Sequence, residues 1–507
     1  MAYRLRVAAG LAAGLRRHDW RAARTFVALH YPGQSLPVRW GRFVGWSLRQ
    51  MFSVIPQEMR EVTIAKSVDC KPIWLAQGNP LANHPWQGNP AATLTGRADT
   101  VVIGAGFTGG AMAYHWSKKA PDDRIMVVLE MDDPADGSSG RNEGLVVMGR
   151  YYAMVYQTVG KHLSAIRKDL DTQDREQLAR QFARVYCQAA YRNGDLIEQT
   201  VRSEGFDCHY VREGWVQAAE EDQQITLAQS VRMAQESGCD DWTAIDPDAV
   251  YRKTGMRVRH NSGFSLAAAS FHPAKWVWSL LQTAMANDKV QLFTRTRVLR
   301  VEEHGDGYRV HTTRGVIHCR YVVSATESYT PLLHRQFHNK IQPTQTQAAF
   351  GDGGPDAMQA GIGISGALFF AGKHQNGGVL IGSDATRVPD RYAGRIQPSR
   401  FLTKFALSEL KRHYPQPYTY RLTHEWSGTV GFTPDEYPVV GLIDTRGQYL
   451  IAGMAGSGSA VSFNGARCLC NRILGRTDEP DDYPAAYFAP SRLLDPEHHQ
   501  WPEIEKR

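Results

Sequence analysis

The pattern of apolar and polar positions changes from irregular to periodic near residue 98. Residues 67–97 are rich in Pro and Gly and follow neither a helical nor a strand period, so we expect an irregular segment there. The apolar run 98–103 predicts a short buried strand, which leads into a glycine-rich turn. A helical stretch then runs to Lys119, and residues 124–130 predict a second strand. This order is typical of a β-α-β unit.

The rest of the chain alternates between helical and strand periods. Between about 160 and 250, apolar residues recur at helical spacing. From 290 to 323, short alternating segments separated by Asp-Gly and Arg-Gly turns predict an antiparallel meander. Residues 340–385 are again rich in strand patterns, and 448–474 predict a strand, a glycine-rich turn and a helix.

The glycine-rich turn has the spacing of a dinucleotide-binding fingerprint. Its first glycine permits a tight turn, its second lets the backbone approach a diphosphate, and its third lets the helix pack on the strand. The predicted cofactor-binding residues of this turn are Gly104, Gly106, Phe107, Thr108 and Gly109. Glu130 ends the second strand 21 residues after Gly109, where an acid is expected to bind a ribose diol.

The fingerprint alone fits either NAD or FAD, and the remaining segments favour FAD. An extended flavin needs contacts from stretches remote in sequence. Three such stretches are residues 137–144, 322–331 and 449–458, so an enzyme that uses only NAD is disfavoured. The further cofactor-binding residues that we predict are Ser139, Gly140, Arg141, Asn142, Gly144, Val298, Ala325, Thr326, Gly453, Gly456, Ser457 and Gly458.

These motifs resemble the D-amino-acid oxidase (DAO) superfamily of FAD-dependent oxidoreductases, in its glycine, sarcosine and γ-glutamylputrescine oxidase-like branch. The similarity covers roughly residues 70–475. It is carried by the segment Ser139-Gly140-Arg141-Asn142, by Ala325-Thr326-Glu327, and by Trp426-Ser427-Gly428 with Asp435, Pro438 and Gly441. In the closing Gly-His-Gly turn, Ser457 stands where His is usual.

The resemblance implies an amine-oxidising flavoenzyme with FAD as cofactor. A hydride would pass from the carbon next to an amine to flavin N5, and the resulting imine would be hydrolysed. The predicted catalytic residues are Arg141, Ser457 and His272. Arg141 and the amides near Gly456 would stabilise negative charge on the reduced ring, although Arg141 also fits a surface loop. His272 precedes a Pro at a helix start and therefore also fits a capping role.

Three more residues carry two interpretations each. His209 and Tyr210 fit either a substrate cavity or a strand in a mixed sheet. Glu327 fits either a ligand for a cationic amine or a turn cap, and we favour the cap.

We therefore predict an α/β fold: a doubly wound, Rossmann-like FAD-binding domain, and a second substrate domain of mixed antiparallel sheet plus helices. The FAD-binding domain comprises residues 98–160, 266–335 with the β-meander, and 426–480. The substrate domain comprises residues 161–265 and 336–425. The remaining segments are a basic helical N-terminal extension (1–66), the irregular lead-in (67–97) and a C-terminal tail (481–507).

The charge is concentrated at the N-terminus. Residues 1–66 carry eleven basic and three acidic side chains, a net charge of +8, whereas the other 441 residues sum to −1. The extension could contact an anionic membrane surface, an acidic partner or nucleic acid, or it could pack on its own body. Nucleic acid is the least favoured, because the extension lacks an aromatic RNA-reading motif. Val7, Leu11 and Leu15 share one helical face, but the run lacks a cleavage site, so a secretory signal is not expected.

Seven scattered cysteines indicate reduced thiols in a cytoplasmic protein, and no metal site is expected. The basic extension would allow peripheral association with a membrane. The electron acceptor of an amine oxidase would be oxygen. An alternative hypothesis is a dehydrogenase of amines or hydroxy acids that passes its electrons to a membrane quinone. A second rival is a nucleotide-bound module that acts on RNA or a protein through the basic extension.

Overall fold

The computed structural model describes residues 27, 34–49, 52–53, 68–148, 151–366, 369–374, 377–387, 390, 393–394 and 397–505. The chain forms two compact units, residues 1–65 and 66–507. In the first unit the structure describes the helix α3 (Leu36–Arg49), whereas Val7, Leu11 and Leu15 lie outside the described residues. None of the described helices has the length and apolar character needed to cross a membrane.

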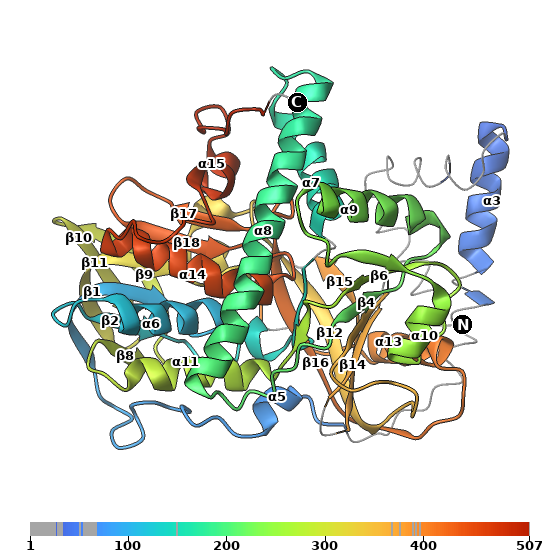
Figure 1. Ribbon diagram of the computed structural model, residues 1–507. Helices are drawn as coiled ribbons and strands as arrows, with labels where there is room; N and C mark the ends of the chain where they lie inside the picture. Colours follow the sequence, from blue (N-terminus) through green and yellow to red (C-terminus); the bar gives the residue numbers. More distant parts are fainter. Residues whose placement is uncertain are drawn as a thin grey trace. The chain divides into compact units, whose positions relative to one another are not determined.

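The first sheet of the large unit has β1 at its centre (Figure 1). Its order is β17-β18-β11-β1-β2-β8, and all neighbours in it are parallel except β17 and β18. Val101 and Val102 of β1 are fully buried, as expected for a parallel strand covered on both faces. The strands are β17 (Val439–Leu442), β18 (Gln448–Ala452), β11 (Gly315–Ser324), β1 (Leu94–Ile103), β2 (Met126–Leu129) and β8 (Val290–Phe293).

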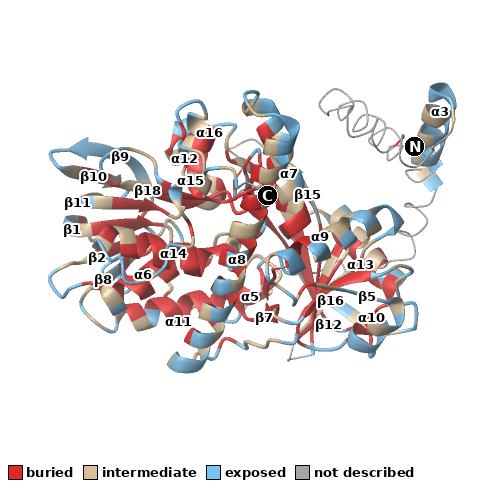
Figure 2. Cartoon of the chain, turned by 45° about the horizontal axis from the view of Figure 1, so that its top comes forward, coloured by how far each residue is buried: buried red, intermediate tan, exposed pale blue. Residues whose placement is uncertain are grey.

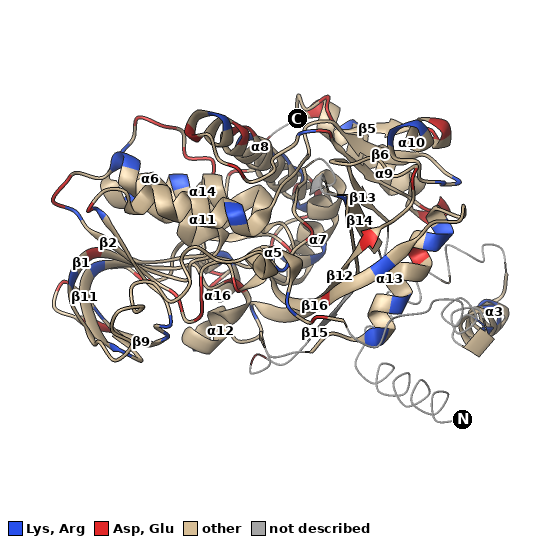
Figure 3. Ribbon diagram, turned by 90° about the horizontal axis from the view of Figure 1, so that it is seen from below, with Lys and Arg blue, Asp and Glu red and all other residues tan. Residues whose placement is uncertain are grey.

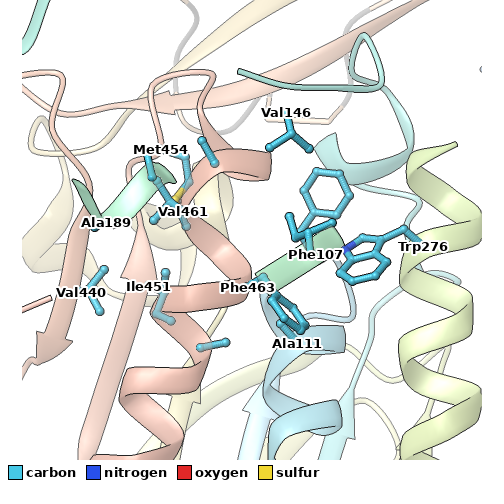
Figure 4. Close-up of a cluster of buried hydrophobic side chains, with 14 of the residues drawn as sticks. Phe107, Ala111, Val146, Ala189, Trp276, Val440, Ile451, Met454, Val461 and Phe463 are labelled. Carbon is cyan, nitrogen blue, oxygen red and sulfur yellow. The ribbon is translucent and has the colours of Figure 1, made fainter. Parts of the chain in front are cut away.

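Helices cover one face of this sheet and a meander covers the other (Figure 3). On the first face lie α6 (Phe107–Lys119), α11 (Pro273–Met285) and α14 (Gly458–Leu474), whose side chains interlock. Trp276 and Phe463, for example, have ring centroids 5.2 Å apart (Figure 4). On the second face, the meander of β9 (Val298–His304), β10 (Gly307–Thr312) and β11 buries Tyr308 and Val310 against the sheet.

The second sheet is mainly antiparallel and has the order β16-β12-β15-β14-β13-β4-β6-β5, with β13 and β4 parallel. Its strands are β16 (Tyr420–Phe432), β12 (Gln342–Gly353), β15 (Val379–Arg387), β14 (Phe369–Lys373), β13 (Gly363–Ser365), β4 (Trp215–Gln217), β6 (Ser262–Ser265) and β5 (Thr243–Ile245). A small pair is formed by β3 (Leu145–Val146) and β7 (Ala269–Ser270).

The longest of the other described helices is α8, with 33 residues. The side chain of Asp171 caps its first turn, and the helix ends at Gly205, which has a left-handed backbone conformation. The remaining helices are α5 (Ile73–Ala76), α7 (Tyr151–Ile166), α8 (Thr172–Glu204), α9 (Gln224–Glu236), α10 (Pro247–Thr254), α12 (Thr330–Leu333), α13 (Arg400–His413), α15 (Ala485–Phe488) and α16 (Ser491–Leu494).

The predicted α/β class, the β-α-β unit and the meander are confirmed. Two local predictions differ from the structure. The first strand begins at Leu94 rather than at residue 98, because its polar first half pairs with β11. His209 and Tyr210 do not lie in a strand: only their neighbour Val211 pairs, in an isolated bridge with Ser270.

Candidate functional site

A cavity of about 480 Å³ lies where the carboxyl ends of β1, β2 and β11 meet. In a parallel sheet this edge is the usual place for a ligand. The walls come from stretches that are far apart in sequence: residues 103–108, 129–145, 296–299, 325–333 and 454–462, with Thr346, Gly428 and Val430 from the second sheet. The cavity therefore lies between the two sheets.

The turn between β1 and α6 has no room for a side chain at its three glycines. Gly104 has a φ of +104°, and a Cβ there would stand 2.6 Å from the carbonyl oxygen of Ala325. A Cβ on Gly106 would stand 2.6 Å from the Ser139 hydroxyl, and one on Gly109 would overlap the carbonyl oxygen of Gly104. The three glycines thus bring the cavity wall, the neighbouring loop and the helix start into direct contact.

Two amides of this turn already have partners. The N–H of Ala105 donates to Glu130 Oε2 at 2.8 Å, and the N–H of Phe107 donates to Ser139 Oγ at 2.8 Å. The next two donors of α6, the N–H groups of Thr108 and Gly109, also have no partner within the helix. Burial raises the pKa of Glu130 to about 7, although backbone amides bind its carboxylate.

The Ser-Gly-Arg-Asn segment is held from both sides. Two indoles donate to its carbonyl groups: Trp74 to Asn142 at 2.9 Å and Trp426 to Arg141 at 2.9 Å. The guanidinium of Arg141 donates to the carbonyl oxygen of Ser427 at 3.2 Å and lines the cavity. Since Trp426 and Ser427 belong to β16, the second sheet fixes the position of this arginine.

The turn before α14 meets this segment. The Ser459 hydroxyl donates to the carbonyl oxygen of Leu145 at 2.5 Å, and Gly456 and Gly458 line the cavity. Ser457 lies between these glycines and is 1% exposed, and its hydroxyl has no hydrogen-bond partner among the described residues. A buried hydroxyl of this kind is costly unless a ligand satisfies it.

Glu327 lines the cavity and links two elements. Its carboxylate accepts hydrogen bonds from the N–H of Gly431, at 2.8 Å, and of Met454, at 3.3 Å. These amides belong to the end of β16 and to the segment after β18, so the side chain ties the second sheet to the cavity wall. Burial raises the pKa of Glu327 to about 7. The contacts agree with the interpretation of Glu327 as a cap.

The structure brings most of the predicted site residues together in this cavity. Those that line it are Gly104, Gly106, Phe107, Thr108, Glu130, Ser139, Arg141, Asn142, Val298, Ala325, Thr326, Gly456 and Gly458. Behind the wall lie Gly109, Gly140, Gly144, Gly453 and Ser457. A Cβ on Gly140 would stand 2.7 Å from the Leu75 side chain, and one on Gly144 would stand 2.7 Å from the Phe271 carbonyl oxygen, so these glycines serve close packing.

His272 lies outside the cavity and caps α11. Its Nδ1 accepts a hydrogen bond from the N–H of Lys275 at 3.1 Å, and its Nε2 lies 3.0 Å from the Gln77 side-chain oxygen. Burial lowers its pKa to about 3, so the imidazole is neutral. These contacts support the capping interpretation of His272 and give no support to a catalytic role.

Sequence reasoning missed several residues of the wall. Met131, Asp132 and Asp136 follow the predicted ribose acid directly and could have been found from that position. Tyr329, Leu332 and Leu333 follow the Ala-Thr strand end in the same way. Thr346 and Val430 carried no local signal, because they come from the second sheet. No group of three or more His, Cys, Asp or Glu in the described part of the chain is placed to hold a metal ion.

The arrangement fits an extended dinucleotide such as FAD. A glycine cradle at a helix start suits a diphosphate. Ser457, whose buried hydroxyl has no partner among the described residues, lies between two glycines that line the same cavity. The walls also come from all three stretches that the sequence analysis assigned to a flavin.

Comparisons with known proteins agree with this geometry. A family model described as FAD dependent oxidoreductase (DAO) matches residues 99–472. The γ-glutamylputrescine oxidoreductase of Escherichia coli K12 is 21% identical over 408 residues, which cover 76% of this chain and 85% of that protein. Among solved structures, L-proline dehydrogenase from P. horikoshii aligns with a TM-score of 0.64 and 17% identity over 80% of this chain and 100% of that one. Glycine oxidase from Geobacillus kaustophilus aligns with a TM-score of 0.61 and 16% identity over 78% of this chain and 98% of that one.

Proposed function

Because the chain belongs to the DAO family of FAD-dependent oxidoreductases, we propose that it oxidises a C–N bond of a small amine or amino acid. The observation that carries this proposal is that one cavity is lined both by the glycine turn at the start of α6 and by Arg141, which contacts the second sheet. The substrate would bind beside the second sheet, next to Thr346 and Val430. The resulting imine would be hydrolysed.

FAD would be held by residues from several segments. Thr108 and Gly109 would donate their N–H groups to the diphosphate at the start of α6, where the helix dipole favours negative charge. Glu130 would accept hydrogen bonds from the ribose diol. When bound, FAD would supply the acceptor for the hydride that leaves the carbon next to the amine nitrogen.

The protein's own residues would prepare the reaction in three ways. Arg141 would hold positive charge near the ring end of the cavity, where a fixed cation stabilises developing negative charge. Ser457 would donate its hydroxyl to a bound ligand, which would satisfy an otherwise unpaired buried group. Leu145, Val430 and Met454 would exclude water from the reacting carbon.

An absorption experiment tests the cofactor and the substrate class together. Purified protein, loaded with FAD if necessary, is expected to show a flavin spectrum that bleaches under anaerobic conditions with members of a panel of amines and amino acids. Matching 2-hydroxy acids serve as controls. Reoxidation by oxygen or by a quinone analogue then identifies the electron acceptor. A protein that shows no flavin spectrum after reconstitution refutes the proposal, and bleaching by hydroxy acids alone refutes the amine substrate.

A further inference from the structure

The helix α3 presents two chemically different faces. At 3.6 residues per turn, its apolar face consists of Leu36, Trp40, Phe43, Val44 and Leu48. Its basic face consists of Arg39, Arg42 and Arg49, together with Trp46. Residues 34–53 contain no acidic side chain. The helix therefore has the amphipathic, basic character of a segment that lies at a membrane surface.

Most of the large apolar side chains of α3 are exposed to solvent, whereas Trp40 and Phe43 are half-buried. Leu36 is 65% exposed, Val44 50%, Leu48 45% and Trp46 48%. None of the 14 residues of the helix is buried (Figure 2). The exposure of Leu36, Val44 and Leu48 is costly, since each of these side chains gives up the free energy that it would gain on transfer to an apolar medium.

We propose that α3 lies flat in the headgroup region of an anionic lipid bilayer, with Leu36, Val44 and Leu48 inserted and its arginines bound to lipid phosphates. Charge complementarity selects this occupant. Residues 1–66 carry a net charge of +8, whereas the rest of the chain sums to −1, so attraction to an anionic surface acts on this part of the protein.

The composition of the helix favours lipid over the alternatives. Nucleic acid would be bound by the arginines but would leave Leu36, Val44 and Leu48 in water. A bilayer takes up both faces at once, and tryptophans such as Trp46 prefer the boundary between headgroups and acyl chains. The helix is 14 residues long, which is too short to cross the bilayer but long enough to lie within its plane.

Flotation of the full-length protein with lipid vesicles tests the proposal. We expect the wild type to float with vesicles of phosphatidylcholine and phosphatidylglycerol at low salt, and to bind vesicles of pure phosphatidylcholine much less. Replacing Arg39, Arg42 and Arg49 by Gln should lower the partition coefficient about 100-fold, since each basic side chain near an anionic surface contributes about fivefold. Replacing Leu36, Val44 and Leu48 by Gln should abolish binding at high salt, where screening leaves only the apolar contribution.

Matched variants outside the helix serve as controls. For the charge, Arg202, Arg300 and Arg421 are replaced by Gln; their side chains are 78%, 63% and 75% exposed. For the apolar face, Ile225 and Leu266, which are 81% and 59% exposed, are replaced by Gln. Both controls should bind like the wild type. Circular dichroism verifies that every variant is folded, which is expected because no altered residue is buried.

Four results would overturn the proposal. The wild type does not float with anionic vesicles, or the controls lose as much binding as the α3 variants. The apolar-face variant binds as tightly as the wild type at every salt concentration, which would mean that the helix does not insert. Alternatively, gel filtration shows that the apolar face joins two copies of the chain and is not available to lipid.

Discussion

Replacing Gly109 by Ala should prevent the protein from binding FAD. A Cβ at this position would overlap the carbonyl oxygen of Gly104 and lie 2.9 Å from its carbonyl carbon. Carbon atoms normally pack at about 3.5 Å or more, so the helix start must move away from the turn by at least about 0.6 Å. Both atoms that it meets belong to the backbone, and no side-chain rotation can relieve the overlap.

The shift would displace the N–H groups of Thr108 and Gly109, which we expect to bind the diphosphate. A hydrogen bond to a charged group contributes about 1.5–3 kcal/mol. Loss of both would cost about 3–6 kcal/mol, which lowers the affinity for FAD by a factor of about 100 to 10⁴.

Gly137→Ala is the matched control. Gly137 lines the same cavity, has an ordinary φ of −74°, and a Cβ there would meet nothing within 4 Å. The FAD content of each purified variant is measured from its visible spectrum, and the Kd from the change in flavin fluorescence during titration of the apoprotein. A Gly109→Ala protein that binds FAD within threefold of the wild type refutes the reasoning, as does an equal loss in Gly137→Ala.

Three further predictions concern charged residues. Arg141→Ala should retain FAD but lower kcat about 100-fold, because a fixed cation near the ring is lost; Arg297→Ala, at the exposed rim of the cavity, should change kcat less than threefold, and equal effects would contradict the assignment. Since the folded-state pKa of Glu327 is raised from 4.5 to about 7, the folded state binds more protons than the unfolded chain between these pH values, and stability falls as pH rises through that range. Glu327→Gln should therefore raise the free energy of unfolding of the apoprotein at pH 8 by up to about 3 kcal/mol, seen as a higher melting temperature, and leave it unchanged near pH 4. A gain of equal size at both pH values would count against this linkage. Arg492 and Asp435 form an ion pair with 3.0 Å between Nε and Oδ2, and their side chains are 1% and 2% exposed, so Arg492→Ala should lower the free energy of unfolding by about 3–5 kcal/mol in urea titrations, and a loss below about 1 kcal/mol would show that the pair is not needed.

The sequence predicted the parts of the fold that local rules control. The turn is specified by glycines at positions 104, 106 and 109, where a side chain would not fit. The strands β1 and β2 contain the apolar runs 101–103 and 126–129, which are buried. The alternation in the predicted meander likewise matches β10, whose residues are alternately half-buried and buried. In each case the pattern and the structure share the same period.

The parts that were missed depend on contacts between distant segments. The polar residues before Ala98 join β1 because β11, more than 200 residues later, supplies hydrogen-bonding partners. Nothing near Thr346 indicates a cavity wall, since the position of this residue follows from the packing of the second sheet beside the first. Local periodicity does not encode such contacts.

The cavity wall is assembled from both halves of the polypeptide, and this has a consequence for biosynthesis. The ribosome makes the cradle at Gly104 about 350 residues before the wall at Gly456 and Gly458. A chain that stops before residue 454 lacks one wall of the cavity, and we expect such a chain not to retain the cofactor.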